Sequence, residues 1–357
     1  MKALKAIISV FVIFGSSVGI HPKGLLNPSR EKAGAIIPKV ILERTRSEEG
    51  ESYVGIRDIT VDESSSIYAF DYINYHIKKY DKEGKLLFTF AGTGEEEGKF
   101  FHLTGIRAVK DSILAVDSIG LSLFDNSGKF LKKRPYAQEV LVDHPAIFSD
   151  GRFVGSQILA DEMVTALIYR SADGKELCRL ASYEISEFFP GIQKGEDFFL
   201  DNTYARAYSY TISPDGDILW ASSDVLQINK FGGEESSLLI EEAATAVPFP
   251  DELRKPLLER QARTKPPLFA YVPDRYQIVH HLLCGSEGDV WVYVKSREQT
   301  GFLRYSKEKK LKGVYAVKAD FDVMKAIVRI FNGQMYFVVN ERDRVKVYSA
   351  ELPGHTP

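Results

Sequence analysis

The sequence lacks the features that mark several common functional classes. Its formal net charge is only −3 over 357 residues, so no global basic field attracts nucleic acid or an anionic membrane. Beyond the predicted signal at 1–19 it has no G-x-S-x-G elbow, and it has no phosphate-binding G-x-x-x-x-G-K-[ST] loop. Its histidines are scattered and form no H-E-x-x-H pair. Local motifs therefore identify neither a catalytic centre, nor a cofactor, nor a metal site.

Cysteine is also scarce, since only Cys178 and Cys284 are present. Two cysteines do not establish a disulfide. In the repeat described below they fall on the third and fifth units, which are not neighbours, whereas a disulfide needs Cα atoms within about 7 Å. We expect two separate, buried thiols.

Aromatic residues are abundant, with 18 tyrosines and 22 phenylalanines against 4 methionines. Aromatic side chains suit pleated, half-buried surfaces, which favours strands. Hydrophobic residues make up 44% of the chain and charged residues 27%, as in an ordinary soluble protein. The composition indicates a β-rich globular chain.

The N-terminus has the order of features of an export signal. Two lysines precede the apolar stretch 6–14, and small residues follow up to Gly19. The stretch is shorter than the about 20 residues that span a bilayer. We predict a cleaved signal at 1–19, a linker at 20–35, no transmembrane segment after cleavage, and a periplasmic or extracellular location. The alternative is a buried N-terminal strand.

A repeat of four short apolar segments organises the rest of the chain. The clearest copy runs from Asp58 to Phe90 and alternates at period two, which is typical of strands with one buried face. The hairpin glycines Gly84, Gly128 and Gly174 are 44 and 46 residues apart. Four-stranded propeller blades repeat at roughly 40 to 50 residues. The spacing predicts a β-propeller.

Six copies are recognisable, because an aromatic residue ends the third segment of each. These aromatics are Tyr80, Phe124, Tyr169, Phe231, Tyr305 and Tyr348. The sixth copy stops near Leu352, before a full fourth strand, and residues 36–46 have strand character. We predict an all-β, six-bladed domain over 36–352, closed when 36–46 becomes the outer strand of the last blade, with a tail at 353–357. The alternative is that 36–46 is a loose arm.

The pattern resembles the NHL-repeat family of six-bladed propellers. The resemblance is best in the segments Ile67–Asp71, Ile77–Lys85 and Phe90–Phe100, and it is only architectural beyond residue 130. The aspartate that ends the second strand is kept at Asp71 and Asp117, whereas copies four and five have Ser222 and Val294 there. Propellers of this kind bind ligands, scaffold proteins, bind nucleic acid or catalyse reactions, so the resemblance implies a fold and not an activity.

Two links between copies are long, 184–205 and 241–275. Long loops in compact domains are often functional, and both are expected on one face, over blades three to five. The second carries a helical pattern that starts near Pro250 and is interrupted by Pro256, so one helix or two short pieces are both open. It serves either as a packing cap or as a ligand lid.

Cationic or titratable residues stand near the start of each innermost strand. They are Arg57, His102, His144, Arg206, His280 and Lys325. If they converge on the central channel, they favour an anionic ligand. The alternative is that they line a wet channel or pair with local acids. Only one of the adjacent His280 and His281 is expected to face the channel, since successive strand residues point to opposite sides.

Two functions remain. The first is an exported, monomeric binding or scaffold module that takes a protein or a small anionic ligand and uses no cofactor. The second is a propeller lyase or hydrolase with a central divalent metal or a His/Arg site. Nucleic acid is not an expected partner.

Overall fold

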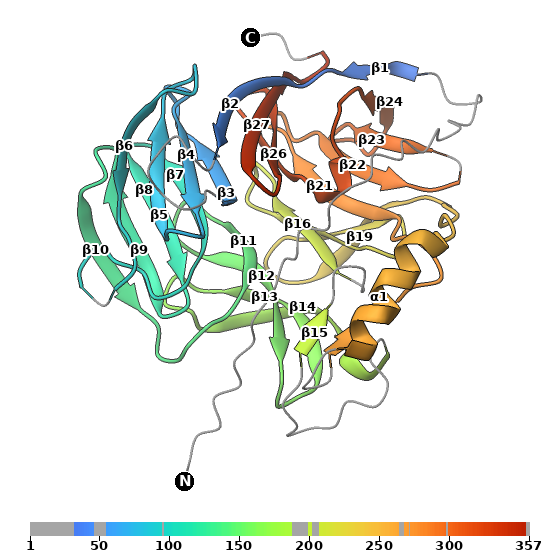
Figure 1. The fold of residues 1–357 in the computed structure, drawn as a ribbon, viewed down its shortest axis with the longest axis horizontal. Coiled ribbons are helices and arrows are strands. Elements are labelled where there is room, and N and C mark those ends of the chain that lie inside the picture. The colour runs from blue at the N-terminus through green and yellow to red at the C-terminus, as the bar shows by residue number, and fades with distance from the viewer. Residues whose placement is uncertain are drawn as a thin grey trace.

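The computed structural model describes residues 32–45, 55–94, 96–187, 199–201, 207–263, 268–270, 272–297 and 299–354. These residues form a ring of six blades, each with four antiparallel strands, as the sequence predicted (Figure 1). The predicted signal peptide at 1–19, most of the first insertion, and Arg206 lie outside the described residues.

The first three blades follow one another along the chain, and within each the first strand lies innermost. Blade one consists of β3 (Ile56–Val61), β4 (Ile67–Asp71), β5 (His76–Tyr80) and β6 (Leu86–Phe90). Blade two consists of β7 (Leu103–Val109), β8 (Ser112–Asp117), β9 (Gly120–Asp125) and β10 (Phe130–Pro135). Blade three consists of β11 (Asp143–Ile147), β12 (Phe153–Leu159), β13 (Val164–Arg170) and β14 (Glu176–Glu184).

The last three blades complete the ring, and the sixth takes its outer strand from the N-terminal side of the chain. Blade four consists of β16 (Tyr208–Ile212), β17 (Ile218–Ser222), β18 (Gln227–Phe231) and β19 (Ser236–Glu241). Blade five consists of β21 (Val279–Cys284), β22 (Val290–Lys295), β23 (Thr300–Tyr305) and β24 (Leu311–Val317). Blade six consists of β25 (Ile327–Phe331), β26 (Gln334–Asn340), β27 (Arg344–Glu351) and β2 (Lys39–Thr45).

Strand β2 closes the ring, as predicted for residues 36–46. It pairs antiparallel with β27, from Lys39 opposite Ser349 to Thr45 opposite Arg344. Its Leu42 is buried between blades six and one. The strand is thus part of the folded ring and not a loose arm.

A further strand, β1 (Lys32–Ile36), lies in the segment that begins as the predicted linker 20–35. It pairs in parallel with β24 and makes blade five five-stranded. Its Ile36 packs into the core between blades five and six. Ordered pairing therefore begins before residue 36, the domain boundary that the sequence suggested.

Apolar side chains fill the space between neighbouring blades. Six clusters of buried residues are found, one for each pair of adjacent blades. All six repeat aromatics are at most 7% exposed. A buried aromatic removes about 150–250 Å² from water, or about 4–6 kcal/mol as an upper bound. These side chains hold the ring together.

The hairpin glycines fix the contact between one blade and the next. Gly84, Gly128 and Gly174 have φ of +82°, +81° and +81°, a conformation that glycine adopts without strain. A Cβ on Gly128 would stand 2.7 Å from the Phe90 ring of the preceding blade. A Cβ on Gly84 would stand 2.0 Å from the Ile41 carbonyl oxygen of β2. The hairpin of blade one thus contacts β2 in the same way that the hairpin of blade two contacts β6, the outer strand of the blade before it.

The second insertion contains one helix, α1 (Asp251–Arg263), with Pro256 inside it. The Pro250 carbonyl accepts hydrogen bonds from the N–H groups of Leu253 and Arg254 (both 3.1 Å). Proline at position 256 removes one backbone donor early in the helix without dividing it.

No helix among the described residues is long and apolar enough to cross a membrane. Cys178 and Cys284 are free and half-buried, so the prediction of separate thiols is confirmed.

Candidate functional site

The two ends of the channel differ in what covers them. We call the link face the end where outer strands connect to the next blade, and the hairpin face the end with the turns between first and second strands. Both insertions leave outer strands, β14 and β19, so both lie on the link face (Figure 1). This agrees with the prediction that they share one face over blades three to five.

The two insertions are joined to each other. Strand β15 (Phe199–Asp201) of the first insertion pairs in parallel with β20 (Leu268–Ala270) of the second, and α1 packs beside β20. Parallel pairing between segments some seventy residues apart requires the two loops to fold together. The loops therefore form one composite structure, which we call the cap.

The base of the cap is a short ladder beside blade five. The Tyr276 N–H donates to the Val247 oxygen (2.8 Å), and the Phe249 N–H donates to the Asp274 oxygen (2.9 Å). The rings of Phe249 and Tyr276 lie 4.9 Å apart. The Arg254 side chain of α1 donates to Asp274 Oδ1 (2.6 Å). The helix is thus tied to the returning chain, which positions Tyr276 over blade five.

Three of the six predicted site residues stand at β-bulges. The register shifts between Ile56 and Asp58, between Asp143 and Ala146, and between Val279 and His281. Arg57, His144 and His280 lie at these shifts. Bulges leave a residue outside the ladder and re-aim its side chain, and they are common beside functional sites. Blade two has a similar shift between Leu103 and Gly105, so four of the six blades have a bulge at this end of the first strand.

The bulge in blade five places both histidines against one tyrosine. The ring centroids of His280 and His281 lie 6.2 and 6.0 Å from that of Tyr293. The expectation that the two would point apart is wrong, because it assumed a regular strand. Two residues of β21 face one residue of β22 here, so alternation fails at this point.

Burial keeps these imidazoles neutral. It lowers the pKa of His280 to about 3 and that of His281 to about 4. His280 Nε2 lies 3.0 Å from the Gln277 oxygen, and His281 Nε2 lies 2.8 Å from the Val323 oxygen. Since a carbonyl only accepts, each Nε2 carries the proton. His280 is therefore not a cation at neutral pH.

An ion pair joins the innermost strands of blades six and one. Arg329 donates to Asp58 Oδ1 from Nε (3.1 Å) and from Nη2 (2.8 Å). Asp58 is 2% exposed, and its other oxygen accepts from the Ile106 N–H of blade two (3.1 Å). This carboxylate thus bonds to two neighbouring blades beside the channel.

Lys295 is the most unusual charged residue at this face. It ends β22 and is only 8% exposed. Its Nζ lies 3.6 Å from the centroid of the Tyr276 ring. Burial lowers its pKa, and the Asp322 carboxylate acts in the opposite direction. Among the residues that the structure describes, no carboxylate oxygen is within 4.0 Å of this nitrogen.

The other predicted residues lie at the link face in simpler settings. His102 is half-buried, and its backbone N–H donates to Asp117 Oδ1 (2.6 Å). His144 is half-buried with a φ of +43°. Lys325 is exposed, in the one-turn helix Val323–Lys325 that precedes β25. Arg206 lies outside the described residues.

No group of three or more His, Cys, Asp and Glu side chains within the described ranges could hold a metal ion. His280 and His281 instead contact backbone carbonyls and the Tyr293 ring.

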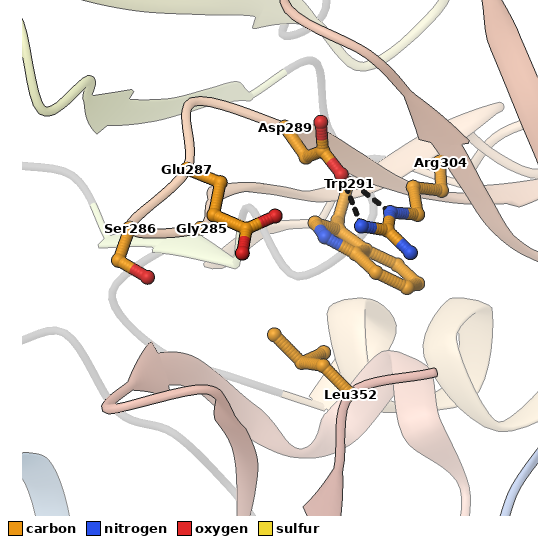
Figure 2. A pocket seen from close by; sticks show the side chains of 7 residues that line it. All are labelled: Gly285, Ser286, Glu287, Asp289, Trp291, Arg304 and Leu352. Carbon is orange, nitrogen blue, oxygen red and sulfur yellow. Dashed lines mark hydrogen bonds and ion pairs between the residues drawn. The ribbon is translucent and has the colours of Figure 1, made fainter. Parts of the chain in front are cut away.

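A small pocket lies at the opposite, hairpin face of blade five (Figure 2). Arg304 Nε donates to Asp289 Oδ2 (2.5 Å), and its guanidinium lies 5.2 Å from the Trp291 ring centroid. The pocket volume is about 10 Å³, roughly the space of one water molecule. Figure 2 shows the Arg304 side chain directed at Asp289, so this pocket is a packing feature and not a ligand site.

Sequence reasoning missed Asp58, Arg329 and Lys295. A faint signal existed for Lys295, because it follows the apolar run Val290–Val294. A lysine that ends such a buried strand is unusual, since lysine is almost never fully buried without a partner. Asp58 and Arg329 gave no local signal, because their pairing joins residues 271 positions apart.

Comparison with known proteins supports the fold. No family model matches the chain, and no curated protein sequence does. A Bacteroides fragilis protein described as exported superposes with a TM-score of 0.53 at 12% identity, over 92% of this chain and 98% of its own.

Two other solved structures give lower scores. A Bacteroides vulgatus member of the DUF4221 family has a TM-score of 0.49 at 11% identity, over 88% of this chain and 97% of its own. The calcium-binding protein regucalcin of Agrobacterium tumefaciens has 0.47 at 11% identity, over 90% and 97%. At such identities similarity shows the fold alone, and only the first score exceeds 0.5. The chain is a six-bladed β-propeller, and its kinship with NHL repeats stays a prediction.

Proposed function

We propose that the protein is an exported, NHL-like propeller that binds a small anionic ligand at the link face, between the cap and the inner strands. The observation that carries this proposal is that both insertions, joined through β15 and β20, lie at this one end. Arg57, His144 and His280 stand at bulges there, and the buried Lys295 lies beside the base of the cap. The hairpin face has a pocket of only about 10 Å³.

The charges near the channel favour an anion. The described side chains there include Arg57 and Lys325, against the carboxylate of Asp322. The Asp58–Arg329 pair is neutral as a unit. Ligand sites combine an apolar wall with a few placed polar groups, and Tyr276, Tyr293 and Phe249 supply the wall. The N-terminal sequence supports export.

The test is a binding screen on the mature protein with citrate, succinate and inorganic phosphate as probes. We expect at least one to raise the melting temperature. In calorimetric titrations Arg57→Ala should then weaken binding at least tenfold, which is about 1.4 kcal/mol. Arg152→Ala is the matched control, because Arg152 is an exposed arginine on the hairpin face.

Two results would contradict the proposal. One is binding that Arg57→Ala and Arg152→Ala affect equally. The other is one tightly bound divalent metal ion per chain, lost in His144→Ala or His280→Ala, which would support the propeller lyase or hydrolase instead.

A further inference from the structure

Lys295 differs from the other buried lysine of the ring. Lys78 is 2% exposed, and its Nζ lies 3.4 Å from Asp71 Oδ2. Lys295 is 8% exposed and has an aromatic ring where Lys78 has a carboxylate. A buried ammonium without a carboxylate is costly, so the neutral amine is favoured.

Blade five lacks the ion pair that blade one has at the end of its second strand. Asp71 stands four residues after Ile67, which pairs with Tyr80. Val294 stands four residues after Val290, which pairs with Tyr305. Leu303, two residues before Tyr305, is at the position of Lys78. Lys295 is therefore an additional buried lysine, for which the repeat provides no carboxylate.

Two effects act on the charge of Lys295 in opposite directions. The face of the Tyr276 ring, from the base of the cap, lies 3.6 Å from Nζ and attracts a cation. Burial disfavours the ammonium and lowers the pKa of the lysine. His280, on β21, interacts with the same charge and is itself neutral. Among the described residues, Asp322, on the link to blade six, is the acidic group whose charge acts on this lysine.

We propose that Lys295 is a nucleophilic amine and that the site between the base of the cap and blade five binds a small aldehyde or ketone as an imine. Desolvated lysines beside apolar walls are suited to this chemistry. The inference goes beyond the proposed function, because covalent capture of a carbonyl compound does not need an anionic ligand in the channel.

The step balances without an added oxidant or reductant. The Nζ lone pair attacks the carbonyl carbon and forms the C–N bond, while the C=O π pair moves to oxygen. One proton passes from nitrogen to oxygen and gives a carbinolamine. Protonation of the hydroxyl releases water and leaves the iminium. In sum, the neutral lysine amine, the carbonyl compound and one proton from solvent give the iminium and water.

The test uses the wild-type mature protein, so that no variant needs to fold. Butyraldehyde and pyridoxal 5′-phosphate serve as an uncharged and an anionic probe, cyanoborohydride traps the imine, and peptide mass spectrometry measures each lysine. We expect Lys295 to be modified at least about threefold faster than Lys82 at pH 7, since a lowered pKa leaves a larger fraction of the amine neutral. Lys82 is 69% exposed and is the reference for an ordinary amine.

Lys78 is the second internal reference, because it is buried but paired, and it should be modified more slowly than either. Lys295→Arg should abolish the fast modification, whereas Lys82→Arg should leave it unchanged. The proposal is overturned if Lys295 reacts no faster than Lys82, or if it reacts only after urea unfolds the chain.

The two proposals fail separately. Loss of anion binding in Arg57→Ala, with fast butyraldehyde trapping retained, supports both. Absence of trapping with anion binding intact removes only the imine site.

Discussion

Blades one and five build the end of the second strand in different ways. In blade one, Asp71 Oδ1 accepts from the N–H groups of Gly55, Ile73 and Asn74 at 3.1–3.3 Å, and Oδ2 pairs with Lys78. In blade five, Val294 packs into the core between blades four and five. The turn that follows is held by Ser296 and by the base of the cap.

The difference shows how a repeat acquires a site. Blade one uses its aspartate to secure the incoming link and to pair with the buried Lys78. Blade five has Val294 and Leu303 at these two positions, and the base of the cap holds the turn instead. Structural support has moved from a side chain to an insertion. Four experiments probe this contrast.

The largest expected effect is at Asp71. Asp71→Ala should lower the free energy of unfolding by about 3–5 kcal/mol, because it removes the carboxylate that pairs with the buried Lys78. Urea unfolding measures this. Asp71→Ala combined with Lys78→Met should recover part of the loss, and a single-variant loss below about 1 kcal/mol would show that the buried pair is unimportant.

The second largest effect on stability is expected where blade one contacts the closing strand β2. Gly84→Ala should cost about 2–3 kcal/mol, because it combines a left-handed backbone with a Cβ placed against the Ile41 carbonyl. Gly216→Ala is the control, since Gly216 has a φ of +86° but nothing within 4 Å of an added Cβ. Equal losses in the two variants would mean that closure by β2 contributes nothing at this point.

Acid should weaken blade five. The pKa values of His280 and His281 lie below the ordinary 6.5, so below pH 6.5 the unfolded chain binds protons that the folded chain does not. Stability should fall as the pH drops from about 6.5 toward 4, by up to about 1.4 kcal/mol per pH unit for each histidine. His280→Gln with His281→Gln should flatten this part of the profile in thermal melts.

The smallest effect is expected at Lys295. Lys295→Met should change the free energy of unfolding by less than about 1 kcal/mol, because the buried ammonium has no carboxylate to leave unpaired. Lys78→Met, measured in parallel, should lower the free energy of unfolding by about 3 kcal/mol, since it removes the ammonium that pairs with the buried Asp71 carboxylate. Similar losses for the two would place Lys295 in an ion pair in solution.

The fold could be predicted because its signals are local and repeated. Gly84, Gly128 and Gly174 mark turns that need a positive φ, and the six aromatics mark the cores between blades. Closure by β2 followed from counting strands, since the sixth copy ends one strand short. These features belong to every blade, so one sequence presents them six times.

The site could be predicted only in part. Arg57, His144 and His280 were selected for their charge and position. A bulge adds one residue to a strand and so interrupts the alternation of side-chain directions, and no sequence pattern marks where it occurs. The side-by-side position of His280 and His281 was missed for this reason. The pairing of β15 with β20 depends on segments far apart in the chain. So does the setting of Lys295, which contacts the Tyr276 ring and has no carboxylate of the described residues within 4.0 Å.

The two N-terminal strands also affect how the chain can fold. β1 lies on the outer edge of blade five and β2 on that of blade six, so one short segment bridges two neighbouring blades. These strands are synthesised early, yet their partners, β24 and β27, lie about 280–310 residues later. Contacts so distant in sequence form slowly. The strands made first are therefore among the last to find their place, and the ring stays open until almost the whole chain has been made.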